Sequence, residues 1–159
     1  MPTTAVKEAA KREPGTSEVT ARELIEGLNR DLAGEFQAIL TYRLFASMVG
    51  GPHRRELRSF FESEIPDELG HAATLADKIV ALGGEPVTEP LPVEVSHDPR
   101  RMLEIALQAE AETIGRYEDR IREADQLGQT GLRVVLEDFV ADETNHKEEI
   151  ERILAGWKD

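Results

Sequence analysis

Apolar residues recur every three or four positions along four long segments of the chain, and polar residues occupy the positions between them. This spacing is typical of amphipathic α-helices that bury one face in a shared core. Clusters of glycine and proline, which end helices, separate the segments. The pattern predicts four helices, over about residues 20–49, 53–82, 99–127 and 131–155.

Two of these helices also carry specific start signals. Thr20 and Glu23 form a capping box, in which each side chain accepts a hydrogen bond from the backbone N–H of the other residue. Asp98 followed by Pro99 places an N-cap before a proline at the first helical position. The first and third helices should therefore begin at these residues.

Residues 83–97 contain three prolines and no helical period, so we expect an extended connection there. Fifteen extended residues span about 50 Å at 3.3 Å each, whereas a helix of nearly thirty residues is about 43 Å long. The connection can run the length of a bundle. We therefore predict an all-α fold, a four-helix bundle of two antiparallel hairpins joined by a long crossover. Residues 1–19 are polar and should form a flexible tail before a single domain over 20–159.

Two Glu-x-x-His motifs lie in the second and fourth segments, and a glutamate precedes each motif by 33 positions. Residues three apart in a helix share a face, so the acid and the imidazole of each motif can point the same way. The six residues form two matching sets, which are Glu35, Glu68 and His71, and Glu110, Glu143 and His146. A third match, from Glu94 to His97, lies among prolines where a regular helix is not expected.

The spacing of these sets places them at one level of the bundle. The midpoint between the two glutamates falls at the Gly51 turn in the first hairpin and close to the Gly128 turn in the second. In antiparallel helices, residues equidistant from the turn lie at the same height. Two such hairpins, which resemble a diverged internal repeat, would bring all six side chains together.

The four glutamates also lie on the apolar faces of their helices, as Glu35 does after Leu28 and Leu32. A buried carboxylate without a partner costs several kcal/mol, whereas two divalent cations would balance four negative charges. Four carboxylates and two imidazoles are the ligands of a di-iron or di-manganese helix bundle. The donors favour iron, manganese or zinc over magnesium or calcium. The alternative is that these acids lie on charged helix surfaces.

Four further residues could support such a site. Tyr42 and Tyr117 each lie seven positions after one of the glutamates, so each phenol could reach the carboxylate level. Each phenol could bond a ligand, donate an electron during oxygen reduction, or simply belong to the core. Asp67 and Asp142 could orient the imidazoles across the bundle, or else lie on the surface.

Composition excludes several other chemistries. The chain has no cysteine, which rules out disulfides, thiolate metal sites and cysteine nucleophiles. Its formal net charge of −13 argues against a phosphate-binding surface, so DNA binding is not expected. No apolar run has transmembrane length, and residues 1–19 lack the apolar core of a signal peptide. We therefore expect no membrane contact and a cytoplasmic location.

With the six residues in place, the chain resembles the ferritin-like superfamily over about residues 20–155, and is most similar to bacterioferritins and Dps-like ferritins. The resemblance implies two iron ions, or manganese or zinc in their place, with Glu68 and Glu143 as bridging ligands. The terminal ligands would be Glu35 with His71 for one ion, and Glu110 with His146 for the other. Tyr42 matches a tyrosine near the bacterioferritin ferroxidase centre. Leu69 stands where bacterioferritins carry a haem-ligating methionine, so no haem is expected.

The same resemblance implies a ferroxidase, which oxidises Fe(II) with O2 or H2O2 for iron storage or detoxification and for protection from oxidative stress. A non-storing di-metal redox enzyme, such as a peroxidase or a manganese catalase, needs the same ligands and stays open. Only 13 residues follow His146, too few for the fifth helix of ferritins that form a 24-subunit cage. We therefore expect a homo-oligomer of twelve chains, with a dimer as the alternative.

Overall fold

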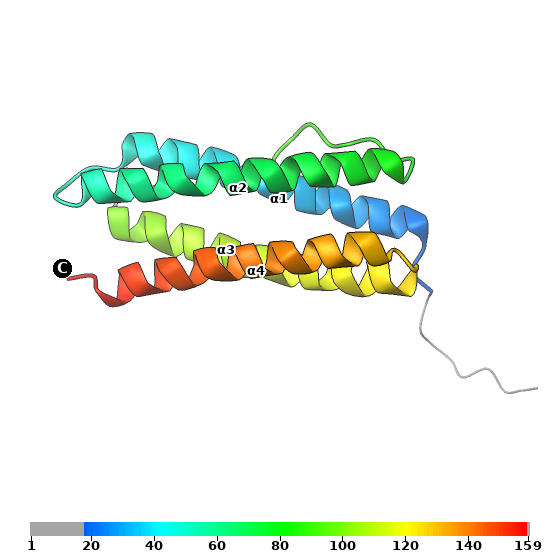
Figure 1. Ribbon diagram of the computed structural model, residues 1–159. Helices are drawn as coiled ribbons and strands as arrows, with labels where there is room; N and C mark the ends of the chain where they lie inside the picture. The colour runs from blue at the N-terminus through cyan, green and yellow to red at the C-terminus, as the bar shows by residue number, and fades with distance from the viewer. Residues whose placement is uncertain (1–17, 159) are drawn as a thin grey trace, which may run out of the picture.

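The computed structural model describes residues 18–158 and folds them into four long helices, with no strand among these residues. α1 covers Ala21–Met48, α2 Arg54–Ala81, α3 Pro99–Gln126 and α4 Thr130–Ala155 (Figure 1). The predicted all-α class is confirmed, and each helix ends within one residue of its predicted position. Residues 1–17 of the predicted tail lie outside the described part of the chain.

The helix ends follow the predicted signals. The Thr20 hydroxyl accepts a hydrogen bond from the Glu23 N–H (3.2 Å), and the Glu23 carboxylate accepts one from the Thr20 N–H (2.7 Å). Asp98 caps α3 by accepting a hydrogen bond from the backbone N–H of Arg100 at 3.2 Å. Glycines with positive φ follow three of the helices, a conformation that other residues rarely adopt. They are Gly51, Gly83 and Gly128, with φ of 81°, 87° and 67°.

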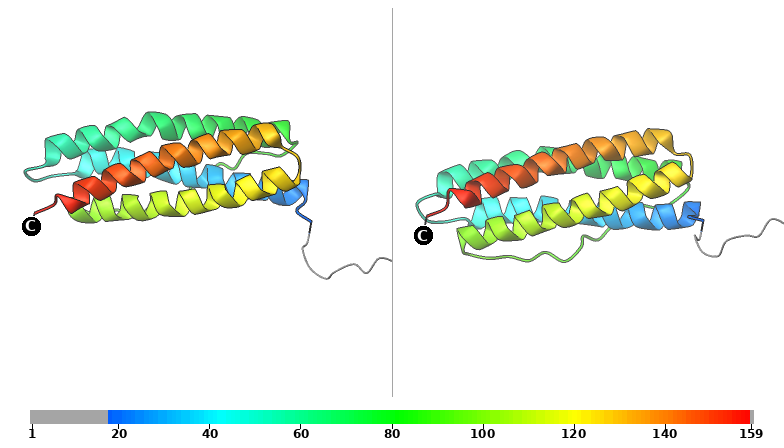
Figure 2. Two further views of the ribbon diagram at one scale, coloured as in Figure 1. Left: turned by 60° about the horizontal axis from the view of Figure 1, so that its bottom comes forward. Right: turned by 90° about the horizontal axis from the view of Figure 1, so that it is seen from below.

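The first two helices form one antiparallel hairpin and the last two form the other (Figures 1 and 2). α1 packs beside α3, and α2 and α4 are the other neighbouring pair across the bundle. The segment 83–97 returns along the bundle from the end of α2 to the start of α3, which confirms the predicted crossover. It is held on α1 by two backbone donors, from Val87 to the Asn29 side chain and from Leu91 to the Ala33 carbonyl, both at 2.9 Å.

Two apolar clusters fill the bundle, one on each side of its middle. The first includes Leu28, Leu32, Leu75, Ile79 and Leu136, and the second includes Phe45, Phe61, Met102, Leu103 and Ile150. Burying one such side chain stabilises the fold by about 1.5–3 kcal/mol. The clusters can therefore offset the cost of a buried polar layer between them. Within residues 18–158, no helix has an apolar stretch long enough to cross a bilayer.

Candidate metal centre

Six ionisable side chains form a buried layer midway along the bundle. None is more than 7% exposed, although glutamate is rarely so buried unless it is paired. They are the six residues that the sequence predicts to meet, namely Glu35 of α1, Glu68 and His71 of α2, Glu110 of α3, and Glu143 and His146 of α4. The helical period turns each side chain inward, and the equal spacing within the two hairpins sets one height for all.

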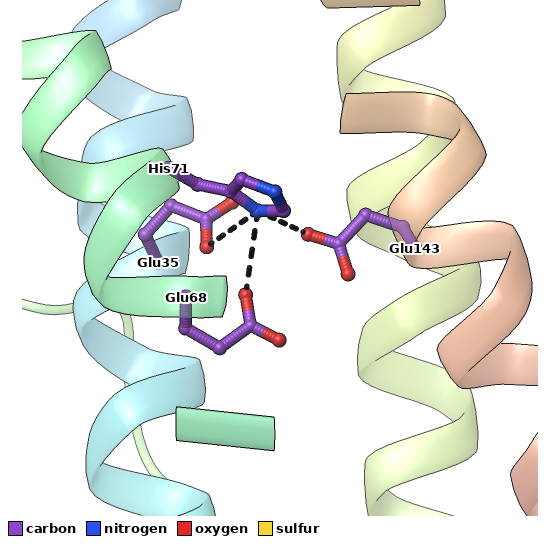
Figure 3. Close-up of side chains that lie close together, drawn as sticks. All are labelled: Glu35, Glu68, His71 and Glu143. Atoms are coloured by element: carbon purple, nitrogen blue, oxygen red, sulfur yellow. Dashed lines mark hydrogen bonds and ion pairs between the residues drawn. The ribbon is translucent and has the colours of Figure 1, made fainter. Parts of the chain in front are cut away.

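The layer contains two groups of potential metal ligands. The Glu35 group consists of Glu35, Glu68, His71 and Glu143 (Figure 3), and the Glu110 group consists of Glu68, Glu110, Glu143 and His146. Within each group, one potential ligand atom per residue lies within 4.8 Å of all the others. Glu68 and Glu143 belong to both groups. The arrangement could therefore hold two cations side by side, with two shared carboxylates between them.

Each imidazole directs the same nitrogen into the layer. His71 Nδ1 lies 3.1 Å from a Glu143 oxygen, 3.7 Å from Glu68 and 3.8 Å from Glu35 (dashed lines in Figure 3). His146 Nδ1 lies 3.1 Å from the other Glu143 oxygen and 3.3 Å from the other Glu68 oxygen. The two shared glutamates thus present one oxygen to each imidazole, as carboxylates that bridge two metal ions do.

The outer nitrogen of each imidazole meets an aspartate of the opposite hairpin. His71 Nε2 lies 3.0 Å from Asp142, and His146 Nε2 lies 3.2 Å from Asp67. A carboxylate that accepts a hydrogen bond from Nε2–H keeps the proton on that nitrogen. In the neutral imidazole, Nδ1 then carries the lone pair that can bind a metal. This geometry places both aspartates where they can orient the imidazoles, as the sequence suggested.

Two buried tyrosines bond the unshared glutamates. The Tyr42 hydroxyl donates to Glu110, and the Tyr117 hydroxyl donates to Glu35, so each phenol crosses to the other hairpin. Burial raises the pKa of both phenols well above 10, and the adjacent carboxylates raise it further. Both tyrosines are therefore protonated donors at neutral pH.

The acids and imidazoles of the layer titrate together. Burial raises the pKa of Glu35 and of Glu110 well above its usual range, and neighbouring glutamates add to the rise. Burial also favours neutral Glu143, but hydrogen bonds from both histidines outweigh it and lower its pKa. Burial alone would lower the pKa of both imidazoles, yet bonds to Glu143 and its neighbours raise the pKa of His71 well above its usual range and that of His146 to about 12. In the metal-free layer, protons held by the glutamates and the imidazoles therefore reduce its negative charge.

The chemistry of the layer fits a pair of divalent cations better than a proton network. One oxygen of Glu35 and one of Glu68 are buried without a hydrogen-bond partner, and such atoms carry a desolvation cost of about 1–3 kcal/mol. Two divalent cations would neutralise four carboxylates and give these oxygens a partner. Mixed carboxylate and imidazole donors suit iron, manganese and zinc.

Two charged residues near the layer were not predicted from the sequence. Glu64 lies one turn before Glu68 and brings an oxygen within 3.3 Å of His146 Nε2. Asp31 is 1% exposed and lies 3.2 Å from the Arg120 guanidinium and 3.7 Å from that of Arg116. Neither position belongs to the Glu-x-x-His pattern. A comparison of the two hairpins, residue by residue, would have singled out both.

Comparison with known proteins agrees with this geometry. The family model of the ferritin-like domain matches residues 25–158. A solved structure described as a ferritin-like, diiron-carboxylate protein from Bacillus anthracis is 57% identical, with a TM-score of 0.83, and the match covers 84% of this chain and 96% of that one. A bacterioferritin from Streptomyces coelicolor is 31% identical over 133 residues, 83% of this chain and 80% of the relative.

Two further matches are described differently. A dodecameric thioferritin from Bacteroides fragilis shares the fold at 24% identity, with a TM-score of 0.79 over 87% of this chain and 88% of that one. A Synechococcus relative, 30% identical over 72% of this chain and 71% of its own length, is a nutrient stress-induced DNA-binding protein. The matched family model, the four-helix fold and the two buried ligand groups agree, and the chain belongs to the ferritin-like family.

Proposed function

We propose that the protein is a ferroxidase, which oxidises Fe(II) at a dinuclear centre contained within one chain. The observation that carries the proposal is the pair of buried ligand groups that share Glu68 and Glu143. Two Fe(II) ions bound as substrate, one in each group, can supply one electron each, and with two protons these reduce O2 to H2O2 or H2O2 to two water molecules. The donor set suits iron, and manganese or zinc could bind in its place.

The six residues take distinct roles in this proposal. Glu68 and Glu143 bridge the two ions, because each offers one oxygen to each group. The terminal ligands are Glu35 with His71 at one position and Glu110 with His146 at the other. Loss of a bridging carboxylate should therefore disturb both ions, whereas loss of a terminal ligand should disturb mainly one.

Surrounding residues prepare the ligands before metal binds. Asp142 and Asp67 accept hydrogen bonds from the outer imidazole nitrogens and fix the rings, so that each Nδ1 can bind a metal once it has released its own proton. Tyr42 and Tyr117 hold the two terminal carboxylates in place. We assign Tyr42 a second role in catalysis, because its hydroxyl contacts a terminal ligand and it matches the tyrosine near the bacterioferritin ferroxidase centre. It would donate one electron and its proton to the oxidant, and a further Fe(II) would reduce the resulting tyrosyl radical.

Oxidised iron would then be stored in a shell of twelve chains, which would protect the cell from oxidative stress. The dodecameric assembly named for the Bacteroides fragilis protein of the same fold supports the twelve-chain part of the proposal. The absence of haem, the absence of DNA binding and the cytoplasmic location stay predictions.

A non-storing di-metal redox enzyme, such as a peroxidase or a manganese catalase, is the second candidate. It needs the same ligands, and since all six come from a single chain, the centre does not by itself require a shell. Such an enzyme could work as a dimer. Particle mass separates the two candidates.

The test is an anaerobic titration with Fe(II), followed by O2 or H2O2, with iron oxidation measured by absorbance and particle size by light scattering. We expect rapid oxidation of two Fe(II) per chain, and further iron held in soluble particles. Glu68→Gln should abolish the rapid phase, while Asp77→Asn, which changes an exposed acid of the same helix, should retain it. Equal rates in wild type and Glu68→Gln would refute the proposal.

A further inference from the structure

The aromatic side chains of this protein are few and unevenly placed. The chain has five phenylalanines, two tyrosines and a single tryptophan. Five of these eight rings belong to the apolar cluster on one side of the metal layer, namely Tyr42, Phe45, Phe60, Phe61 and Trp157. The proposed function uses Tyr42 of this set and leaves the tryptophan at the end of the chain without a role.

Ring contacts lead from Tyr42 away from the metal layer. The ring centroid of Phe61 lies 6.2 Å from that of Tyr42 and 5.6 Å from that of Phe60. The half-buried indole of Trp157 packs against the same cluster, lines one pocket together with Phe60, and lies 5.3 Å from the His53 imidazole. Packed rings therefore connect the buried phenol to the end of the bundle where the C-terminus lies near the turn between α1 and α2 (Figure 1).

The second buried tyrosine lacks this connection. Tyr117 contacts Phe139 and His71, with centroid distances of 5.6 Å and 6.5 Å. Within residues 18–158, the ring contacts of Phe139 lead only back to Tyr117 and His71. Because the chain has one tryptophan, the Tyr42 side of the layer alone is joined to an oxidisable ring near the surface.

Two pockets differ in the size of molecule that they can admit. A pocket of about 10 Å³ between α1 and α3 reaches the metal layer and is lined by Tyr42 and Glu110, which leaves room for about one water-sized molecule. The pocket beside Trp157, here called the end pocket, has a volume of about 400 Å³, within the range of small-molecule sites. An organic reductant can therefore touch Trp157 but cannot touch Tyr42.

The walls of the end pocket suit an aromatic ring that carries a polar substituent. Leu57, Phe60 and Ile153 line it together with the indole, so that an apolar ring can pack among them. Exposed Arg152 and Lys158 lie at its edge and can donate hydrogen bonds to an oxygen atom. A phenol has both features, and an electron-rich phenol can lose one hydrogen atom to an indole radical.

We infer that Trp157 is the outer end of an electron path from Tyr42, and that the end pocket binds a small electron-rich phenol as the reductant of this path. Once Fe(II) is exhausted, the Tyr42 radical takes an electron from the indole and a proton from water, while the indole releases its N–H proton to solvent. The phenol then transfers one hydrogen atom to the indole radical, and two of the resulting phenoxyl radicals couple to each other. The inference rests on the proposed ferroxidase, in which Tyr42 is oxidised, and adds a substrate class to it.

Binding in the end pocket can be tested without iron or catalysis, because Trp157 is the only tryptophan of the chain. Guaiacol, which is 2-methoxyphenol, is titrated into the metal-free protein while the indole fluorescence is recorded. We expect quenching that saturates, as binding at a single site requires. Quenching that rises linearly without saturation, as collisions in solution produce, would overturn the inference.

Electron paramagnetic resonance of rapidly frozen samples tests the path itself. Protein loaded anaerobically with two Fe(II) per chain is mixed with O2, and the tyrosyl radical is followed with and without guaiacol. We expect guaiacol to shorten the lifetime of the radical in wild type, and Tyr42→Phe to abolish the signal. Trp157→Phe keeps a ring but removes the oxidisable indole, so the lifetime with guaiacol should lengthen at least about tenfold, which corresponds to about 1.4 kcal/mol in the barrier.

Two further variants separate electron transfer from packing. Trp157→Tyr restores an oxidisable ring and should return the lifetime with guaiacol toward the wild-type value, which a purely structural role of the indole would not predict. Val134→Thr, at an exposed position of α4, should leave the lifetime unchanged.

The possible failures of the inference and of the proposed function can be told apart. Rapid Fe(II) oxidation with equal radical lifetimes in wild type and Trp157→Phe would overturn the electron path and leave the ferroxidase intact. Rapid oxidation without any tyrosyl radical would overturn the path together with the electron-donor role of Tyr42. Absence of rapid Fe(II) oxidation would overturn the ferroxidase and this inference with it.

Discussion

Replacing Glu35 with glutamine should stabilise the metal-free protein while weakening metal binding. The Glu35 side chain is 1% exposed; one oxygen accepts from Tyr117 and the other has no hydrogen-bond partner. Burial raises the pKa of this carboxyl well above its ordinary 4.5; the His71 imidazole, 3.8 Å away, lowers it, and the charge of Glu68 adds to the rise. In the metal-free protein above pH 4.5, folding therefore favours the protonated form of this carboxyl.

The size of the effect follows from that proton uptake. In the unfolded chain the carboxyl is ionised at pH 7, and protonating it costs about 1.4 kcal/mol per pH unit above its ordinary pKa, or about 3 kcal/mol. Glutamine is neutral in both states and keeps an oxygen for Tyr117. We expect Glu35→Gln to raise the free energy of unfolding by about 1–3 kcal/mol at pH 7, allowing for imperfect packing of the new amide.

The stability difference between Glu35→Gln and wild type should depend on pH in a defined direction. Because the folded-state pKa of Glu35 is raised, the stability that this carboxyl contributes is fully present below about pH 4.5 and is lost as the pH rises above it. The advantage of Glu35→Gln should therefore vanish near pH 4 and grow toward pH 8. Urea unfolding followed by circular dichroism, in EDTA and at several pH values, measures the difference directly.

A matched control and added metal complete the test. Glu118→Gln, at an exposed position of α3, should change the free energy of unfolding by no more than about 0.5 kcal/mol. Saturating Zn(II) should stabilise the wild type more than Glu35→Gln, because the bound ion stabilises only the folded state that holds it. A stability difference between Glu35→Gln and wild type that does not change between pH 4 and pH 8 would refute the reasoning.

Four other outcomes follow from the same geometry. Glu143→Gln should lower bound Co(II) from two ions per chain to at most one by elemental analysis, and two retained ions would argue against bridging. Tyr42→Phe should keep both ions but slow Fe(II) oxidation in stopped-flow measurements, and an unchanged rate would exclude its proposed role. With a net charge of −13, the protein should not retard DNA in a gel at about 0.15 M salt, and a shifted band would place it functionally nearer the Synechococcus relative. Light scattering should give a mass near twelve chains, whereas a stable dimer would favour the non-storing redox enzyme.

Helix ends and ligand height could be predicted from sequence because both depend on local rules. Caps and glycines end the helices within a turn, and equal distances from a tight turn set equal heights. The identity of the neighbouring helix depends on how the two hairpins pack. Tyr42 was therefore predicted at the carboxylate level, but its partner, Glu110 of the other hairpin, could not be predicted from its position in α1.

The two further charged residues near the layer were harder to predict. Asp31 and Glu64 each lie on the buried face of their helix, since Asp31 follows buried Leu28 by three residues and Glu64 follows buried Phe61 by three. Asp31 is 1% exposed, whereas the Glu64 side chain remains 12% exposed beside His146. The helical period places both acids on a buried face, but it cannot identify their partners, which lie on other helices.

Anomalous scattering at the iron edge, from crystals soaked anaerobically in Fe(II), tests the central claim most directly. The proposal predicts two peaks about 3.5–4 Å apart inside one chain. One peak should lie against Glu35 and His71, the other against Glu110 and His146, with Glu68 and Glu143 between them. A single peak in this layer, or iron bound only elsewhere on the molecule, would contradict the claim.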